Sequence, residues 1–460
     1  MVFLGEISYF CTQIMMNWQQ LISNKRLGQE HRHPERHDDR TEFKRDYDRL
    51  VFSAPFRRLQ NKTQVFPLPG SIFVHNRLTH SLEVASVGMS LGNDVATKLT
   101  QRHPELKETL FQEIGQIVAT ACLAHDLGNP PFGHSGEKAM QAYFLEGAGT
   151  NLQREVSPIF WNDLIHFEGN ANAFRILTHQ FKGRRPGGFV MTYSMLASIV
   201  KYPYSSTAAG KKGKFGFFDT EKEYYLRIAQ ELGIPCLSKM GEPLRFARHP
   251  LVYLVEAADD ICYEIMDLDD AHKLKIISHD EAMQLLLSFF DDETRQHILH
   301  RIEEEGVTDD NEKVVYLRAC VIGKLENECV RVFIENEEAI LEGTFEGSLI
   351  DHISSIQQEA YERCIKLSVK RIYKSRPVLD VELSGYQIIQ TLMQQFIGAA
   401  VHPERFYSKH LISRVSSQYD IDAPDLETRL MSVIDYISGM TDVYALDVYQ
   451  KINGIALPIV

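Results

Sequence analysis

Apolar residues along this chain recur mainly at helical spacing, and the strict alternation that marks a surface strand is rare. Helices are predicted to begin near Thr41 and at Asn76. The same periodicity predicts helices over residues 111–127, 137–144, 171–179, 191–201, 250–271, 279–290, 293–304, 311–339, 349–375, 383–399 and 423–440. We therefore predict an all-α fold that is too large to be a simple helix bundle.

Three polar segments interrupt this pattern. Residues 25–49 are dominated by charge, and we expect residues 1–40 to form a flexible arm. Residues 57–67 mix basic and amide side chains, as the wall of a pocket does. Residues 203–220 are rich in Gly, Lys and Ser, which predicts a mobile loop. After the arm, the chain is expected to divide into a region 41–275 and a helical C-terminal region 276–460 packed on it.

Composition and charge narrow the class of protein. The chain has 460 residues, of which 44% are hydrophobic and 24% charged, values typical of a globular protein with a large core. The formal net charge of -13 argues against a protein that wraps DNA or RNA. Single-stranded nucleic acid is therefore an unsupported partner, but a local basic pocket for a small polyphosphate stays open.

Cysteine usage and the N-terminus bear on the compartment. The seven cysteines are odd in number and form no CxxC pair, which favours free thiols in a reducing cytosol. The first sixteen residues are apolar but are broken by Glu6 and Gln13 and follow no basic segment. They are too short to span a bilayer and make a poor signal peptide. We expect a cytoplasmic protein with no membrane association.

One short stretch carries most of the candidate chemistry. His125 and Asp126 are adjacent at the end of a nearly all-apolar predicted helix, a compact arrangement for holding one divalent metal ion. A Gly/Pro-rich turn follows, and then His134 and Glu137 come three residues apart. Each piece also has a structural explanation. An isolated His-Asp pair is common by chance, a turn histidine can bond to backbone, and Glu137 can complement a helix dipole.

Other predicted helices supply the remaining metal ligands. His80 follows Arg77 by one helical turn. Asp259 is the candidate carboxylate from a distant helix, where Asp259, Tyr263 and Asp267 form an i, i+4, i+8 stripe. Such a stripe is a solvated face if exposed, and it is expensive to bury unless it binds something. Together, the order H…HD…D on successive helices favours a metal site. Nitrogen and oxygen ligands suit Mg, Mn or Co, with Zn, Fe and Ni as alternatives.

Several longer strings resemble a known family. The order H…HD…D is that of the HD superfamily of metal-dependent phosphohydrolases. The strings RRLQNKTQVFP, NRLTHSLEV, AHDLGNPPFGHSGE, HFEGNANAFRIL and EAADDICYEIMDLDDA resemble the bacterial deoxyguanosine triphosphate triphosphohydrolase (dGTPase) family. The resemblance is strong over residues 40 to 275 and implies an HD core at about residues 77–270. The C-terminal region carries no comparable string.

The resemblance implies an activity and a metal site. The expected reaction is hydrolysis of a deoxynucleoside triphosphate, dGTP first, at the α-phosphate to give deoxynucleoside and intact tripolyphosphate. A divalent metal would be held by His80, His125, Asp126 and Asp259. His134 matches the family's catalytic histidine and Glu137 its partner acid.

The resemblance also implies the substrate contacts. Tyr263 and Asp267 match positions beside the sugar, where a tyrosine ring leaves no room for a 2′-OH and a carboxylate accepts from the 3′-OH. Gln64 matches a position near the sugar and base. Lys201, Tyr202 and Lys214 match positions that hold the triphosphate, and Asn170 is expected to support the site. The alternative for Lys214 is a solvated loop residue, because the loop around it aligns less firmly.

Two rival functions stay open. One is another HD-type nucleotide phosphohydrolase, such as a nucleotidase or phosphodiesterase. The other is a catalytically silent nucleotide-sensing or nucleic-acid-binding HD protein, against which the intact His134 and Glu137 pair argues. The resemblance further implies a homo-oligomer, with a hexamer favoured, and a second, regulatory nucleotide in some members.

Overall fold

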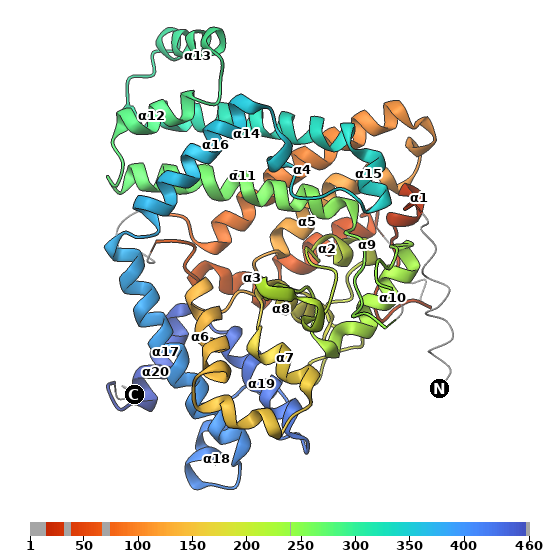
Figure 1. Ribbon diagram of the computed structural model, residues 1–460, viewed down its shortest axis with the longest axis vertical. Coiled ribbons are helices and arrows are strands. Elements are labelled where there is room, and N and C mark those ends of the chain that lie inside the picture. Colours follow the sequence, from red (N-terminus) through yellow and green to blue (C-terminus); the bar gives the residue numbers. More distant parts are fainter. Residues whose placement is uncertain (1–14, 32–37, 67–73, 240, 457–460) are drawn as a thin grey trace.

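A computed structural model describes residues 15–31, 38–66, 74–239 and 241–456. Within these ranges the regular structure is helical, and pairing between extended segments is limited to isolated bridges, so the predicted all-α class is confirmed (Figure 1). None of the helices described is long and apolar enough to cross a membrane. Cys11 and most of the apolar N-terminal residues lie outside the described ranges. The six described cysteines are free thiols, and four of them are buried.

The described residues up to Lys273 form eleven α-helices, besides short 3-10 helices. These are α1 (Trp18–Leu21), α2 (Glu42–Val51), α3 (Ala54–Arg58), α4 (Arg77–Arg102), α5 (Ile114–Ala124), α6 (Gly133–Leu145), α7 (Pro158–Ile165), α8 (Gly169–Thr178), α9 (Tyr193–Ser198), α10 (Lys222–Leu232) and α11 (Pro250–Lys273). The second half continues with α12 (His279–Leu287), α13 (Asp292–Glu304), α14 (Asp310–Glu335), α15 (Glu337–Glu342), α16 (Ser355–Leu367), α17 (Arg376–Val401), α18 (Phe406–Ile412), α19 (Leu426–Ser438) and α20 (Asp442–Ile452).

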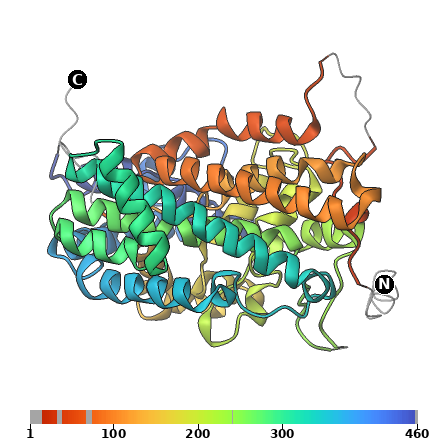
Figure 2. The same ribbon diagram turned by 90° about the horizontal axis from the view of Figure 1, so that it is seen from above.

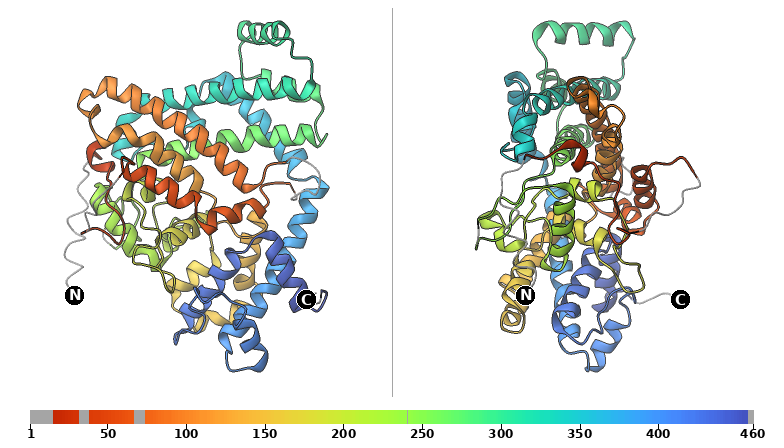
Figure 3. Two further views of the ribbon diagram at one scale, coloured as in Figure 1. Left: turned by 180° about the vertical axis from the view of Figure 1, so that it is seen from behind. Right: turned by 90° about the vertical axis from the view of Figure 1, so that its right-hand side faces the viewer.

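The helices pack around two apolar cores. The first lies among the long helices α4, α5, α11 and α14, and Figure 2 shows α4 and α14 running side by side. The second lies among α6, α7, α17 and α19. Figure 3 shows α17 to α20 as a group below the long helices, with α13 projecting at the opposite end. The candidate site falls where the two groups meet.

Two glycines let α4 and α5 approach closely. A Cβ added to Gly92 would lie 2.6 Å from the Cα of Gly115, and one added to Gly88 would lie 2.5 Å from the sulfur of Cys122. Helix α4 is held at its start by a capping box between Asn76 and Thr79. The close approach brings the first turns of α4 beside the end of α5, and that contact positions two histidines of the site.

Some predicted bounds differ from the structure. The helix predicted at 111–127 is a 3-10 turn, Leu110–Glu113, followed by α5, and it ends early because a Gly/Pro-rich turn follows. The helix predicted at 349–375 is α16 followed by a π-helical turn, Ser368–Ile372. Helices α7, α10, α18 and α20 lie outside the predicted ranges. They are short, so tertiary packing stabilises them more than local periodicity does.

Two segments expected to be loose are packed. Within the predicted arm, Trp18 is buried against the rings of Phe111 and Phe333, and the buried Arg26 pairs with Asp46. The loop 203–220 is anchored by buried phenylalanines 215, 217 and 218. These contacts fix the ends of the segment that carries Lys214.

Candidate functional site

Three of the four predicted metal ligands converge. His80 on α4, His125 at the end of α5 and Asp259 on α11 each offer one ligand atom, and these atoms all lie within 4.8 Å of one another. Asp259 Oδ1 is 3.0 Å from His80 Nε2 and 3.4 Å from His125 Nε2. The structure thus has a possible His/Asp metal site built from three helices.

Asp126 lies at the edge of this cluster. Its Oδ1 is 3.6 Å from His125 Nε2 and accepts a hydrogen bond from the Asn129 side chain. Its Oδ2 accepts from the Arg77 guanidinium at 2.7 Å. Burial opposes ionisation of Asp126, but the charges of Arg77 and His125 lower its pKa on balance. Arg77, one turn before His80, therefore holds this carboxylate ionised.

The unpartnered atoms of the cluster fit a divalent cation. The backbone carbonyl of Cys122 lies 2.6 Å from His125 Nδ1, so this nitrogen donates and the other can act as a ligand. His125 Nε2 is buried and lacks a hydrogen bond. Burial lowers the pKa of His125, whereas the neighbouring carboxylates of Asp126 and Asp259 raise it to about 9 on balance. Imidazole nitrogens beside carboxylate oxygens suit first-row divalent metals and Mg.

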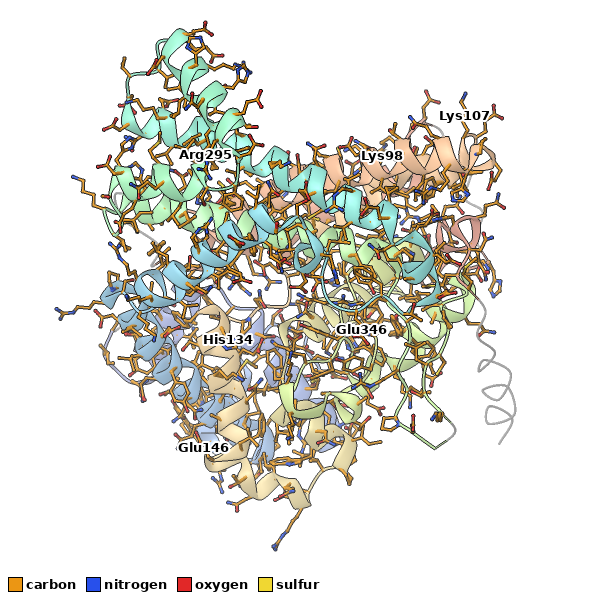
Figure 4. The ribbon with its side chains drawn as sticks, turned by 45° about the horizontal axis from the view of Figure 1, so that its top comes forward. Lys98, Lys107, His134, Glu146, Arg295 and Glu346 are labelled. Atoms are coloured by element: carbon orange, nitrogen blue, oxygen red, sulfur yellow. The ribbon has the colours of Figure 1, made fainter. Side chains whose placement is uncertain are left out.

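The turn after His125 and Asp126 sets the direction of α6. Phe132, the N-cap of α6, has φ 61°, and Gly133, its first residue, has φ 56°, so two successive residues adopt the left-handed conformation where the helix begins. His134 follows in the first helical turn, and Figure 4 labels it below the layer of long helices. Its Nδ1 lies 3.8 Å from Glu137 Oε1. The predicted pair is therefore brought together, at a distance longer than a hydrogen bond.

His134 and Glu137 differ in environment. The His134 side chain is 67% exposed, whereas that of Glu137 is 6% exposed. Partial burial and the charges of Lys214 and Lys138 lower the pKa of His134, which favours the neutral imidazole near pH 7. An exposed, neutral imidazole is available for proton exchange with a bound molecule.

Glu137 belongs to a buried ion-pair group with Lys214 and Glu168. Glu168 was not among the residues predicted from the sequence. Lys214 Nζ is 3.3 Å from Glu137 Oε1 and 2.7 Å from Glu168 Oε1. The other oxygen of Glu137 accepts from the backbone N–H of Gly169 at 3.2 Å, and the Asn170 side chain donates to Glu168 at 2.9 Å. Burial and the Glu137 charge raise the pKa of Glu168. Glu168 is also the N-cap of α8, and it lies within the string HFEGNANAFRIL that carries the family resemblance.

The stripe Asp259, Tyr263 and Asp267 on α11 runs from the cluster of candidate metal ligands into the protein interior. The Tyr263 ring centroid lies 6.4 Å from that of His80 and 6.1 Å from that of Tyr373. Asp267 is buried and accepts a hydrogen bond from the Tyr373 hydroxyl at 2.9 Å. Burial raises the pKa of Asp267 well above its ordinary value. Tyr373 was also missed, and it follows the π-helical turn before α17.

Lys201, Tyr202 and Gln64, the other predicted substrate residues, have contacts separate from those of the metal ligands and of Glu137. Lys201 Nζ is 3.0 Å from Glu256 Oε1 and 5.9 Å from the centre of the Tyr202 ring. Arg248, which the sequence reasoning did not single out, contacts the second oxygen of Glu256 at 3.0 Å. Gln64 has a buried side-chain oxygen without a hydrogen bond. Among the described residues, neither Gln64 nor Lys201 makes a hydrogen bond or ion pair with the His80, His125 and Asp259 cluster.

Comparison with known proteins now identifies the family. The HD domain model matches residues 77–167, and the phosphohydrolase-associated domain model matches residues 353–451. A deoxyguanosinetriphosphate triphosphohydrolase-like protein of Pseudomonas aeruginosa is 37% identical over 96% of this chain and 100% of its own length. This chain belongs to the deoxyguanosinetriphosphate triphosphohydrolase-like family. Another protein of that name, from Synechocystis, is 36% identical over the same shares. A Yersinia enterocolitica deoxyguanosinetriphosphate triphosphohydrolase is 30% identical over 89% of this chain and 93% of its own.

Membership extends the similarity well beyond the strings seen in the sequence. This chain is an HD-type phosphohydrolase. The matched HD segment carries His80, His125, Asp126 and the His134–Glu137 pair. Asp259 comes from α11, beyond the end of that segment. The site therefore depends on helices on both sides of the loop 203–220.

Proposed function

We propose that this protein hydrolyses a deoxynucleoside triphosphate at the α-phosphate, with dGTP as the first substrate to test, and releases deoxynucleoside and tripolyphosphate. The observation that carries the proposal is the pair His134 and Glu137 on α6, which follows the His125-Asp126 end of α5 by one turn. Full-length relatives named for this reaction support the choice of substrate.

The metal assignment is part of the proposal. His80, His125, Asp126 and Asp259 would hold one divalent cation, with Mg, Mn or Co first and Zn, Fe or Ni as alternatives. A bound divalent cation polarises a phosphoryl oxygen and lowers the pKa of bound water from about 15.7 to about 7. Arg77 keeps Asp126 ionised and oriented from the side away from the cluster.

His134 and Glu137 are proposed to handle protons. Departure of the nucleoside through its 5′-oxygen requires a proton on that oxygen. His134, with its lowered pKa, can take a proton from water and deliver it to the leaving oxygen. Glu137 steadies the imidazolium that forms in between, once the 3.8 Å separation closes to a hydrogen bond. In the free protein the position of Glu137 is set by Lys214 and by the Gly169 N–H, and the Gly169 contact does not depend on Lys214.

The residues proposed to bind the triphosphate include two lysines that form ion pairs with carboxylates in the free protein. Lys201, Tyr202 and Lys214 are proposed to bind the triphosphate, whose charge can replace that of Glu256, Glu137 and Glu168 on the two lysines. The triphosphate would thus release carboxylates while it binds cations, so a net acidic protein can still bind a polyanion.

The sugar end of the substrate is proposed to lie along α11. Tyr263, 36% exposed, would pack under the deoxyribose where a 2′-OH would clash. Asp267 would accept from the 3′-OH in place of the Tyr373 hydroxyl that it now binds. Gln64 is assigned to the base and sugar and Asn170 to support of Glu168. The buried, unpaired oxygen of Gln64 supports a polar partner there.

We further propose a cytoplasmic homo-oligomer, with a hexamer favoured and a second nucleotide as a possible effector. Large apolar side chains that are exposed on the single chain support association, namely Leu383 at 70%, Phe406 at 80% and Val443 at 58%. Light scattering after gel filtration, with and without dNTP, should give the mass of six chains. A monomer under both conditions would contradict this part of the proposal.

The direct test is product identification. The protein is incubated with each dNTP singly and with the four mixed, in the presence of Mg, Mn or Co. Chromatography with ³¹P detection should show tripolyphosphate and deoxynucleoside. The variant His125→Ala should lose both metal binding and turnover, and the exposed control His410→Ala on α18 should keep both. Release of orthophosphate or pyrophosphate would favour another HD-type phosphohydrolase. Tight binding of metal and dNTP without turnover would favour a nucleotide sensor.

A further inference from the structure

Helix α20, near the C-terminus, carries a buried carboxylate that lies beside the proposed site. Asp442, the first residue of α20, is 6% exposed. Its Oδ1 accepts a hydrogen bond from the backbone N–H of Phe132 at 2.9 Å. Its Oδ2 accepts from the backbone N–H of Thr63 at 2.8 Å. One side chain therefore joins two segments that lie 310 and 379 residues before it.

The Phe132 contact stabilises a backbone conformation that the residue would otherwise avoid. Phe132 occupies the left-handed region, which is disfavoured for any residue with a Cβ. It is the N-cap of α6 and provides no side-chain cap. Because His134 and Glu137 lie in the next five residues, the angle at Phe132 decides where both point. The Asp442 carboxylate is the group that holds the Phe132 N–H.

The Thr63 contact reaches the other side of the site. Thr63 forms a backbone bridge with Asn76, the N-cap of α4, and it immediately precedes Gln64. Helix α4 carries His80 into the metal cluster. Asp442 thus connects the start of α4 with the start of α6. Its two carboxylate oxygens fix the distance between the helix that carries His80 and the helix that carries His134 and Glu137.

Two neighbouring contacts show that this junction is tightly packed. The buried Lys62 Nζ donates to the backbone carbonyls of Asn129, in the turn before α6, and Ser438, at the end of α19. On α17, a Cβ added to Gly385 would lie 2.6 Å from the Cβ of Phe132. Ser438, Gly385 and Asp442 all fall within residues 353–451, the segment matched by the phosphohydrolase-associated domain model.

We propose that Asp442 is a positioning residue for the reaction, acting from the associated domain on the start of α6 and on the Thr63–Gln64 segment. The inference rests on the proposed function and deepens it, because it assigns the C-terminal domain a part in the active centre. Asp442 does not exchange protons with substrate, since both of its oxygens are occupied by backbone amides. Its role requires two acceptors on one planar group.

That requirement defines the test variants. Asp442→Asn keeps one acceptor and places an NH₂ group against the second backbone N–H, so it breaks one of the two links. Asp442→Ala breaks both. The matched control is Asp447→Asn on the same helix, where the side chain is 43% exposed and pairs with Lys451 at 2.8 Å. Circular dichroism and thermal unfolding check that each variant is folded. If Asp442→Ala does not fold, Asp442→Asn alone tests the proposal.

The kinetic experiment separates positioning from metal binding. A shift of about 1 Å in a catalytic group can cost about a hundredfold in rate. We therefore expect kcat for dGTP to fall about tenfold in Asp442→Asn and about a hundredfold in Asp442→Ala. KM for dGTP should rise, because the Thr63–Gln64 segment loses its hydrogen bond to Asp442. The stoichiometry of Mn binding should stay at the wild-type value, and Asp447→Asn should match wild type throughout. A kcat that is unchanged in both Asp442 variants would overturn the proposal.

The second arm needs no substrate. Amide hydrogen exchange, followed by mass spectrometry, should rise in peptides covering residues 60–66 and 128–136 of both Asp442 variants and nowhere else. Unchanged exchange in both segments overturns the proposal even if kcat falls. If the wild-type protein releases no tripolyphosphate, the proposed function fails, and the exchange arm still reports separately whether Asp442 holds the two segments.

Discussion

Asp163, a buried carboxyl outside the proposed catalytic groups, gives a quantitative prediction about stability. It lies on α7, is 3% exposed, and accepts a hydrogen bond from the backbone N–H of Asp219 at 2.9 Å. Burial is the main cause that raises its pKa from 3.8 to about 7, and the charges of Asp219 and Glu221 add to the shift. This contact fixes the far end of the loop that carries Lys214.

The sign follows from the higher pKa of the folded state. Between about pH 4 and pH 7 the folded protein holds a proton on Asp163 that the unfolded chain has released. Its stabilising effect is fully present below the unfolded pKa and is lost as the pH rises through the folded pKa. At about 1.4 kcal/mol for each pKa unit, the loss between pH 5 and pH 8 is about 3 kcal/mol.

The variant Asp163→Asn removes this titration and keeps an acceptor for the Asp219 N–H. Because the unfolded wild-type chain has already released this proton at pH 5, the free energy of unfolding of the variant should be about 1–2 kcal/mol above wild type at pH 5 and about 4–5 kcal/mol above it at pH 8. Urea unfolding at the two pH values measures both differences, with the exposed Asp380→Asn on α17 as the control. A variant less stable than wild type at pH 8, or a difference independent of pH, would refute the reasoning.

Three further substitutions test other contacts of the site and core. Glu256→Gln removes a carboxylate that holds Lys201, so KM for dGTP should fall about fivefold, as expected for an ion pair worth about 1 kcal/mol. Tyr373→Phe leaves the buried Asp267 without its donor and should lower the free energy of unfolding by about 1–3 kcal/mol in urea. Arg175→Met strands two buried carboxylates and should cost about 3–5 kcal/mol, measured in the same way. An unchanged KM in the first, or unchanged stability in the others, would contradict these assignments.

The convergence of His80, His125 and Asp259 could be predicted from the sequence because these residues lie on helices with strong periodicity. His80, His125 and Asp259 each sit on or next to a long apolar pattern, so their helices could be predicted and their order matched to a family. The fourth ligand was harder to judge, since both oxygens of Asp126 already have donors in the free protein.

The remaining site contacts could not be predicted from sequence. Lys214 meets Glu168 across 46 residues, Asp267 meets Tyr373 across 106, and Phe132 meets Asp442 across 310. No local pattern selects such partners, because tertiary packing of segments far apart in the chain brings each pair together. The left-handed backbone at Phe132 was equally invisible, since that conformation is normally assigned to glycine.

The C-terminal region also changes the interpretation of the domain architecture. From sequence it was expected only to pack on residues 41–275. In the structure α17 shares an apolar core with α6, and α20 supplies Asp442 to the turn before it. Truncation after α16 would therefore remove support from the helix that carries His134 and Glu137, and the proposed active centre extends into the last helix of the chain.

The central claim is that water attacks the α-phosphate and the nucleoside leaves through its 5′-oxygen. The most direct measurement is ³¹P NMR and mass spectrometry of the products formed from dGTP in ¹⁸O-labelled water with Mn. The account predicts intact tripolyphosphate carrying one labelled oxygen and unlabelled deoxyguanosine. Label in the deoxyguanosine, or the appearance of orthophosphate or pyrophosphate in place of tripolyphosphate, would contradict it.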